Sequence, residues 1–138
     1  MTALVATGPS TATYTAATSA TFYVSLGSAA QLAFVTQPAS TTAGSPTISF
    51  KVALEDTYNN VETGDTGTSI TLAIGTNAGS GSLSGITTVT DTNGVATFSV
   101  SINNPGTGYT LVATGPSTAT YTPAVSYTHL TLPTILLV

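Results

Sequence analysis

The stretch "TISFKVALED", residues 47–56, indicates the fold of this chain most directly. Apolar and polar residues alternate along it, so that Lys51 lies on the face opposite the apolar set. That set consists of Ile48, Phe50, Val52 and Leu54. A period of two residues is typical of a β-strand with one face buried and the other in solvent. The stretch therefore predicts a strand that contributes one side to a hydrophobic core.

The same alternation recurs along most of the chain. It is found in "ATSATFYVSL" (17–26), "AQLAFVTQP" (30–38), "SITLAI" (69–74), "GVATFSVSI" (94–102) and "GYTLVATG" (108–115). Segments rich in Gly, Asn, Asp and Pro separate these stretches, at 43–46, 56–60, 77–85, 91–94 and 103–108. Such residues favour turns, and short strands at this spacing are typical of a sandwich or barrel. The pattern predicts an all-β, antiparallel β-sandwich without helices.

Twelve letters of the sequence occur twice without a change. "LVATGPSTATYT" occupies residues 4–15 and again residues 111–122, so the distance from Leu4 to Leu111 is the period of a repeat. That period suits one sandwich of about 100 residues in a tandem array. We therefore expect residues 1–28 to be the terminal strands of a preceding repeat, residues 29–122 to form one sandwich, and residues 123–138 to be a diverged tail. The linker between repeats is then "GSAA", residues 27–30.

Composition limits the partners and the location. Only 4% of the 138 residues are charged, the net charge is −4, and Lys51 is the only basic side chain. A nucleic acid or an anionic membrane needs a basic surface, so neither is an expected partner. The longest apolar run, "ILLV", is too short to span a bilayer, which predicts no membrane insertion. A Thr-rich, Lys-poor β-sequence favours an extracellular location, although the first ten residues contain no secretory signal.

Residues 30–122 resemble a known group of proteins. The resemblance rests on "QP" at 37–38, the Asn-rich turn after Asp56, "GVATF" at 94–98 and "GYTL" at 108–111. The chain is similar there to the bacterial immunoglobulin-like domains that form tandem arrays in surface proteins and adhesins. The resemblance implies a Greek-key, immunoglobulin-like sandwich and transfers no catalytic residue. Asn59 stands where many members have Gly, and Asn also tolerates a left-handed backbone.

The C-terminal tail has two interpretations. "VSYTHLTLPT", residues 125–134, resembles the translated sequencing-adapter sequence found at broken ends of gene fragments. The alternative is a diverged last strand in which Val125, Tyr127 and His129 alternate.

Few residues suggest chemistry. His129, the only imidazole, has no acidic or Cys partner near it in the sequence. The spacing of the acidic cluster (Glu55, Asp56, Glu62 and Asp65) fits no Ca²⁺ loop, so turn hydrogen bonds are the preferred explanation. Asp91 precedes an Asn-Gly hairpin turn, and Lys51 is expected to face solvent, away from any isopeptide chemistry. We predict no enzyme, no cofactor and no metal site.

Two classes of function remain. One is a structural repeat whose partners are copies of itself or adjacent repeats, forming a rod or fibre. The other is a module that binds a glycan or host protein through the loops at one end of the sandwich. The first class includes strand exchange, because the sandwich at 29–122 is expected to lack its final strand. Residues 17–26 would then insert beside residues 109–113, from a neighbour or by folding back. The interface would consist of Ala20, Phe22, Val24, Leu26, Tyr109, Leu111 and Ala113.

Overall fold

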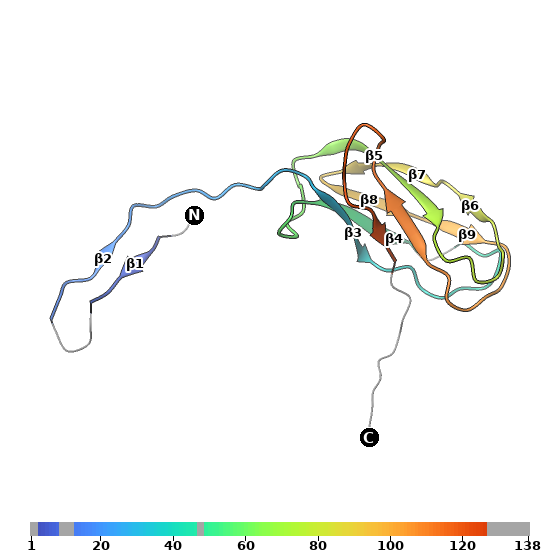
Figure 1. Cartoon of the computed structure of the whole chain (residues 1–138), viewed down its shortest axis with the longest axis horizontal. Helices are drawn as coiled ribbons and strands as arrows, with labels where there is room; N and C mark the ends of the chain where they lie inside the picture. Colours follow the sequence, from blue (N-terminus) through green and yellow to red (C-terminus); the bar gives the residue numbers. More distant parts are fainter. Residues whose placement is uncertain (1–2, 9–12, 47–48, 127–138) are drawn as a thin grey trace, which may run out of the picture.

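A computed structural model describes residues 3–8, 13–46 and 49–126 of the chain (Figure 1). These residues form strands and loops and contain no helix, which confirms the predicted all-β class. The strands are β1 (Val5–Ala6), β2 (Ala17–Thr18), β3 (Gln31–Thr36), β4 (Phe50–Glu55), β5 (Thr66–Ile74), β6 (Leu83–Gly85), β7 (Thr88–Thr92), β8 (Val95–Phe98), β9 (Val100–Ile102), β10 (Leu111–Thr114) and β11 (Ala124–Val125).

The strands from β3 onward form an antiparallel sandwich. Hydrogen bonds connect seven of them in the order β11-β10-β5-β7-β8-β4-β3, while β6 pairs with β9. The row bends at the β7–β8 hairpin, where a single residue pair, Thr92 with Val95, joins the layer that contains β10, β5 and β7 to the layer that contains β8, β4 and β3. A parallel bridge between Gln31 and Thr122 brings the two ends of the row together. The row of strands therefore wraps around one core, as a sandwich with bridged edges.

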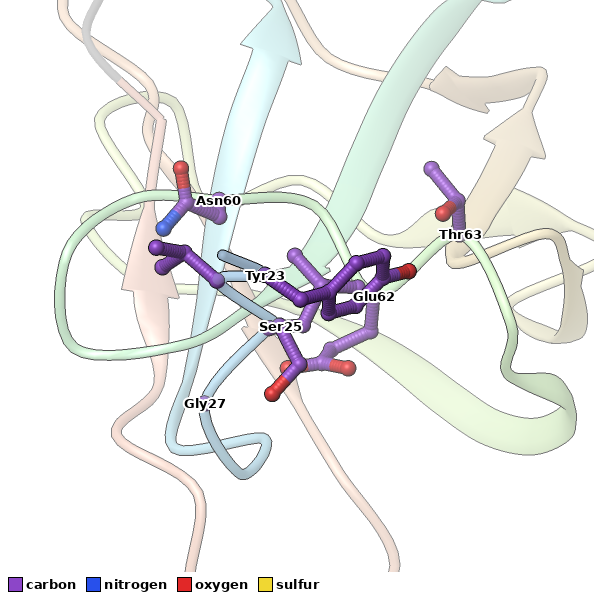
Figure 2. A pocket seen from close by; sticks show the side chains of 8 residues that line it. Tyr23, Ser25, Gly27, Asn60, Glu62 and Thr63 are labelled. Atoms are coloured by element: carbon purple, nitrogen blue, oxygen red, sulfur yellow. The ribbon is translucent and has the colours of Figure 1, made fainter. Parts of the chain in front are cut away.

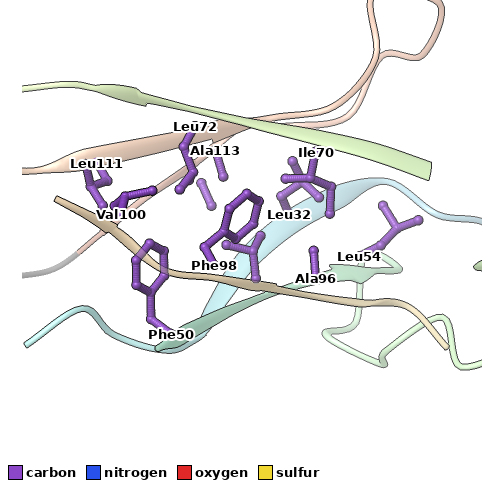
Figure 3. Packing of buried hydrophobic residues seen from close by; sticks show 12 residues of the cluster. Leu32, Phe50, Leu54, Ile70, Leu72, Ala96, Phe98, Val100, Leu111 and Ala113 are labelled. Carbon is purple, nitrogen blue, oxygen red and sulfur yellow. The ribbon is translucent and has the colours of Figure 1, made fainter. Parts of the chain in front are cut away.

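The core lies between the two layers (Figure 3). Leu72 of β5 and Leu111 of β10 contribute side chains from one layer, and Phe50 of β4 faces them from the other. The rings of Phe50 and Phe98 stack with their centroids 5.8 Å apart. Burial of such apolar side chains is the main favourable term in folding. The rest of this buried cluster consists of Leu32, Val52, Leu54, Ile70, Ala96, Val100, Ala113 and Ala124.

The alternation in residues 47–56 is confirmed only at the start of β4. Phe50, Val52 and Leu54 are buried and Lys51 is exposed, but Ala53 and Glu55 on the opposite face are buried too, and Ile48 lies outside the described residues. The stretch 94–102, expected as one strand, is divided into β8 and β9 at Ser99. This division lets the chain pair with β4 first and then with β6.

Two turns have the backbone that their residues predict. Asn93 and Gly94, between β7 and β8, have φ of 52° and 78°. Positive φ at both central residues is the mark of the tight hairpin turn that Asn-Gly favours. Asn59 has φ of 68°, which confirms the left-handed backbone expected at that position. Both turns lie at the end of the sandwich where the N-terminal arm joins it, because the Gly27 N–H donates to Asp56 and Gly94 lies against Glu62, which borders the same hollow as arm residue Tyr23.

Candidate functional site at the repeated hairpin and the linker

The last two strands of the sandwich form what we call the C-terminal hairpin, residues 111–126. In it Val112 pairs with Val125 and Ala113 with Ala124. The Ser126 N–H donates to Leu111 O at 2.7 Å, and the Leu111 N–H donates to Ser126 Oγ at 2.7 Å. Strand β10 also pairs with β5 over four residues, which places Leu111 and Ala113 in the core. This hairpin therefore closes one edge of the core.

The first two strands repeat this arrangement. They form what we call the N-terminal hairpin, residues 4–8 and 13–19. Val5 pairs with Thr18 and Ala6 with Ala17, so each pair lies one repeat period before its counterpart in the C-terminal hairpin. The Ser19 N–H donates to Leu4 O at 2.9 Å, and the Leu4 N–H donates to Ser19 Oγ at 3.0 Å. The register and both serine hydrogen bonds are thus the same in the two hairpins.

The two hairpins differ in what covers them. Leu111 is 4% exposed, whereas its counterpart Leu4 is 63% exposed. Ala124 is buried in the core, and its counterpart Ala17 is exposed. In Figure 1 the N-terminal hairpin stands away from the sandwich at the end of an extended arm. Its apolar face therefore has no cover among the described residues.

The structure separates the two halves of the expected strand-exchange interface. Ala20, Phe22, Val24 and Leu26 are all exposed, Val24 at 81%, and do not lie beside β10. Leu111 and Ala113 are buried, and Tyr109 is partly buried with its O–H donating to Asn104 O. Within one chain, β11 fills the edge that was expected to be open. Exchange of residues 17–26 between chains stays a prediction.

The sequence contained a signal for β11 that the twelve identical letters did not reveal. Two residues past that identity, Ala17 matches Ala124, and Ser19 matches Ser126. Ala fills the buried position, and Ser makes both hydrogen bonds to the neighbouring strand. The outer position tolerates change, because Val125 is 59% exposed where Thr18 stands in the first copy. The sandwich thus continues through Ser126.

One carboxylate, that of Asp56, holds the first residue of the linker, while Ala30 at its other end is hydrogen-bonded through its backbone to Glu55 and Thr122. Asp56 is buried and accepts four hydrogen bonds, from the N–H groups of Tyr58, Asn60 and Gly27 and from the Asn60 side chain. The Asn60 bonds, followed by those from Tyr58 and Gly27, lower the pKa of Asp56 to about 2. Turn chemistry, the role expected for Asp56, is confirmed. The bond from the Gly27 N–H, at 3.1 Å, adds a contact that the sequence did not predict.

A hollow of about 690 Å³ lies between the end of the N-terminal arm, residues 23–27, and the loop that follows Asn60 (Figure 2). Tyr23 and Leu26 line it from the arm, and Glu62 and Thr63 line it from the loop. Tyr23 is strongly exposed, as is Tyr58 in the neighbouring turn. The Gln31 side chain donates to Glu55 Oε2 and Asn59 Oδ1, so the turn is also tied to the start of β3. This end of the sandwich is therefore the end that the N-terminal arm contacts.

Three carboxylate oxygens near the β7–β8 turn are buried without a hydrogen-bond partner among the described residues. They are Glu62 Oε1, Asp65 Oδ2 and Asp91 Oδ2. The other oxygen of Asp91 accepts from the Thr68 N–H at 2.7 Å. Burial, together with the neighbouring Asp65 carboxyl, raises the pKa of Asp91. Asp91 was expected to serve only the turn, so its burial is a feature that sequence reasoning missed.

The remaining chemical candidates give no site in the described part of the chain. Lys51 is exposed on β4, and His129 lies outside the described residues. Residues 3–8, 13–46 and 49–126 contain no group of three or more His, Cys, Asp or Glu placed to hold a metal ion. The same residues include no helix long and apolar enough to cross a bilayer.

The fold and the two hairpins define this chain as an all-β sandwich that carries a second, uncovered copy of its own closing hairpin. No protein-family model, curated protein or solved structure matches it.

Proposed function

We propose that the chain is a non-catalytic structural repeat of an extracellular surface protein or filament. In this proposal the sandwich is an immunoglobulin-like, Greek-key unit, and its partners are adjacent copies of itself. The observation that carries the proposal is the N-terminal hairpin, which repeats the C-terminal hairpin in sequence and in register. A hairpin with an uncovered core face is what remains when one unit of an array is represented only by its end.

The linker supports a stiff joint between units. The proposal requires residues 20–26, which lie outside the strands of this structure, to pair with the preceding unit. The four residues "GSAA", 27–30, that then remain are too few to let two sandwiches swing freely, and the Gly27 N–H is held by Asp56 at the first of them. The Asp56 carboxylate also accepts hydrogen bonds from the Tyr58 and Asn60 N–H groups of its own turn, which fix its position. An array of units joined in this way would form a rod or fibre that extends away from a surface. Exchange of the strand 17–26 between neighbouring units remains part of this proposal.

A protein with two complete units tests the joint. Residues 1–122 followed directly by residues 16–138 create it from native sequence alone, because Thr15 and Thr122 are equivalent. The chain lacks Cys, so Thr97→Cys in each unit gives two specific spin-label sites on exposed positions of β8. We expect one narrow distance distribution between the labels. The matched control has four Gly/Ser residues inserted before Gly27 of the central linker and should give a broad distribution.

The two distributions decide the proposal. A native linker that gives a distribution as broad as the inserted one would show that the units swing freely and would refute the rod. A narrow native distribution that broadens on insertion supports it.

A second candidate function rests on the hollow beside the linker. Exposed aromatic rings, amides and carboxylates are the groups that bind sugars, and Tyr23, Asn60 and Glu62 border the hollow. In this case the protein would be an adhesin or carbohydrate-binding module that recognises a glycan or host surface. A glycan array probed with the wild type, Tyr23→Ala and Tyr14→Ala tests it. Binding that Tyr23→Ala abolishes and Tyr14→Ala retains favours the module, whereas absence of binding by the wild type removes this candidate.

A further inference from the structure

We infer that the N-terminal hairpin of one chain docks on the sandwich of a second copy in the position of that copy's C-terminal hairpin. The inference refines the proposed exchange between neighbouring copies. It rests on the proposed function only in requiring that two copies of the chain come into contact. It differs in the segment and in the place: the whole hairpin replaces residues 111–126, instead of one strand adding beside residues 109–113.

The docking position is defined by the contacts of the C-terminal hairpin. Leu111 pairs with Ile74 of β5, and Ala113 pairs with Leu72. Their counterparts, Leu4 and Ala6, are the same residues on the same face of the same hairpin. The edge of β5 that accepts the backbone and side chains of the C-terminal hairpin therefore also accepts those of the N-terminal hairpin.

The turn packing is also shared by the two hairpins. A Cβ added to Gly115 would meet the Tyr121 ring at 2.5 Å, and one added to Gly8 would likewise meet the Tyr14 ring. In both hairpins the tyrosine thus lies against the glycine that belongs to the repeated letters. The N-terminal hairpin holds this shape although its Tyr14 is exposed, so it needs no remodelling before it docks.

The substitutions between the copies avoid the core. Within residues 4–19 and 111–126 the copies differ only at Ala16, which replaces Pro123, and at Thr18, which replaces Val125. Val125 is exposed on the outer face of β11, so a Thr there removes no core contact. The buried Ala and the hydrogen-bonding Ser are the same in both copies.

The arrangement of the arm favours a second copy over the chain's own sandwich. Gly27 is fixed at Asp56, and the arm before it extends away from the sandwich (Figure 1). To fold back, residues 20–26 would have to reverse along the outside of the sheet. Docking on another copy needs no such reversal, and exchange of identical elements between copies is a known route to assembly. Because the two hairpins offer nearly the same contacts, occupancy depends on concentration and on the state of the acceptor's own hairpin.

Substitution of equivalent leucines in the full chain tests the exchange. Leu111→Asp places a carboxylate in the core and expels the chain's own hairpin, while Leu4→Asp disables the N-terminal hairpin at the matching position. We expect Leu111→Asp to remain folded as an assembly with a mass at least twice the 13.7 kDa of one chain. The double variant should be unfolded, and Leu4→Asp alone should be a folded monomer. Circular dichroism melts and light scattering after size exclusion give both readouts.

Two results would overturn the inference. If Leu111→Asp and the double variant show the same melting behaviour, the N-terminal hairpin cannot take the place of the C-terminal hairpin. A folded, monomeric Leu111→Asp would show that the hairpin folds back on its own chain. Neither result bears on the stiffness of the linker, which the spin-label experiment measures separately.

An oxidative cross-link locates the docked hairpin. Val112 pairs with Ala73 of β5, and Val5 is the counterpart of Val112. In the Leu111→Asp background, Val5→Cys with Ala73→Cys should give disulfide-linked chains of two or more copies. Val5→Cys with Thr97→Cys, on exposed β8, is the control that should stay monomeric on a denaturing gel. Equal cross-linking of the two pairs would contradict the proposed position.

Discussion

Substitution of Leu111 and Leu4 by Ala should have very different effects, although both lie in the same twelve letters of sequence. Leu111 is 4% exposed and packs in the core between β5 and the opposite layer, whereas Leu4 is 63% exposed. The change of residue, the residues that follow it and the pairing with the second strand of the hairpin are the same at both positions. Only Leu111 also pairs with β5 and packs in the core, so the comparison measures what the sandwich contributes to one of two matching hairpins.

The expected magnitude follows from the two exposures. Removing a buried Leu side chain costs the transfer energy of three carbons plus a cavity, about 3 kcal/mol or more. At the exposed position the cost should be within about 0.5 kcal/mol. The difference corresponds to a factor of about a hundred in the unfolding equilibrium. For a domain of this size, Leu111→Ala should lower the melting temperature by roughly 10 °C or more.

Urea unfolding of the wild type and the two variants measures the effect. The chain should be dilute, so that a hairpin from another copy does not rescue Leu111→Ala. Equal unfolding free energies for the two variants would refute the placement of Leu111 in the core and of Leu4 outside it. A large loss for Leu4→Ala would show instead that the N-terminal hairpin is covered in solution.

Three further changes test the polar and turn contacts. Asp91→Asn should raise the stability at pH 7. Burial and Asp65 raise the pKa of Asp91, so the folded state loses stability as pH rises through that pKa. Urea titrations at pH 4 and pH 7 should show a higher unfolding free energy for the variant only at pH 7. The hydrogen bonds to Asp56 lower its pKa to about 2, so the stability they contribute is present above the unfolded pKa of about 3.9 and is lost as pH falls toward 2; Asp56→Asn should flatten acid unfolding in that window, and an unchanged acid profile would contradict the role of this carboxylate. Gly94→Ala should cost at least about 1 kcal/mol more than Gly44→Ala, because both have left-handed φ but only at Gly94 would the new Cβ meet a backbone oxygen, Glu62 O at 2.5 Å; equal urea midpoints would show that the close approach is absent.

The strands of the sandwich could be predicted because their burial follows a local pattern. Phe50 and Val52 are buried on either side of exposed Lys51 at the start of β4, and the Asn-Gly and Asn-Asn turns allow the backbone that the structure has. Strand β11 was expected only as the alternative to an adapter tail, with Val125, Tyr127 and His129 alternating, because a strand of two residues carries no periodic signal; Tyr127 and His129 lie outside the described residues. Its position depends on Ala124 and Ser126, which matter through contacts with β10 rather than through their own sequence pattern.

The candidate site was predictable in its parts but not in its assembly. The repeat identified the N-terminal hairpin as a second copy, yet its register is a property of strand pairing that only the structure shows. The bond from Gly27 to Asp56 joins residues far apart in sequence, and the burial of Asp91 depends on how β5 pairs with β7, whose register shifts between Thr66 and Ser69. Contacts of this kind are non-local, so neither composition nor spacing reports them.

Sequencing the gene beyond both ends of this chain tests the central claim most directly. We expect further copies of the sandwich at the period that separates Leu4 from Leu111, the spacing of the two hairpins. The copy that precedes residues 4–19 should contain the β5 strand that covers Leu4 and Ala6. A gene that encodes one sandwich, with no second β5 upstream of the N-terminal hairpin, would contradict the assignment of this chain to a tandem array.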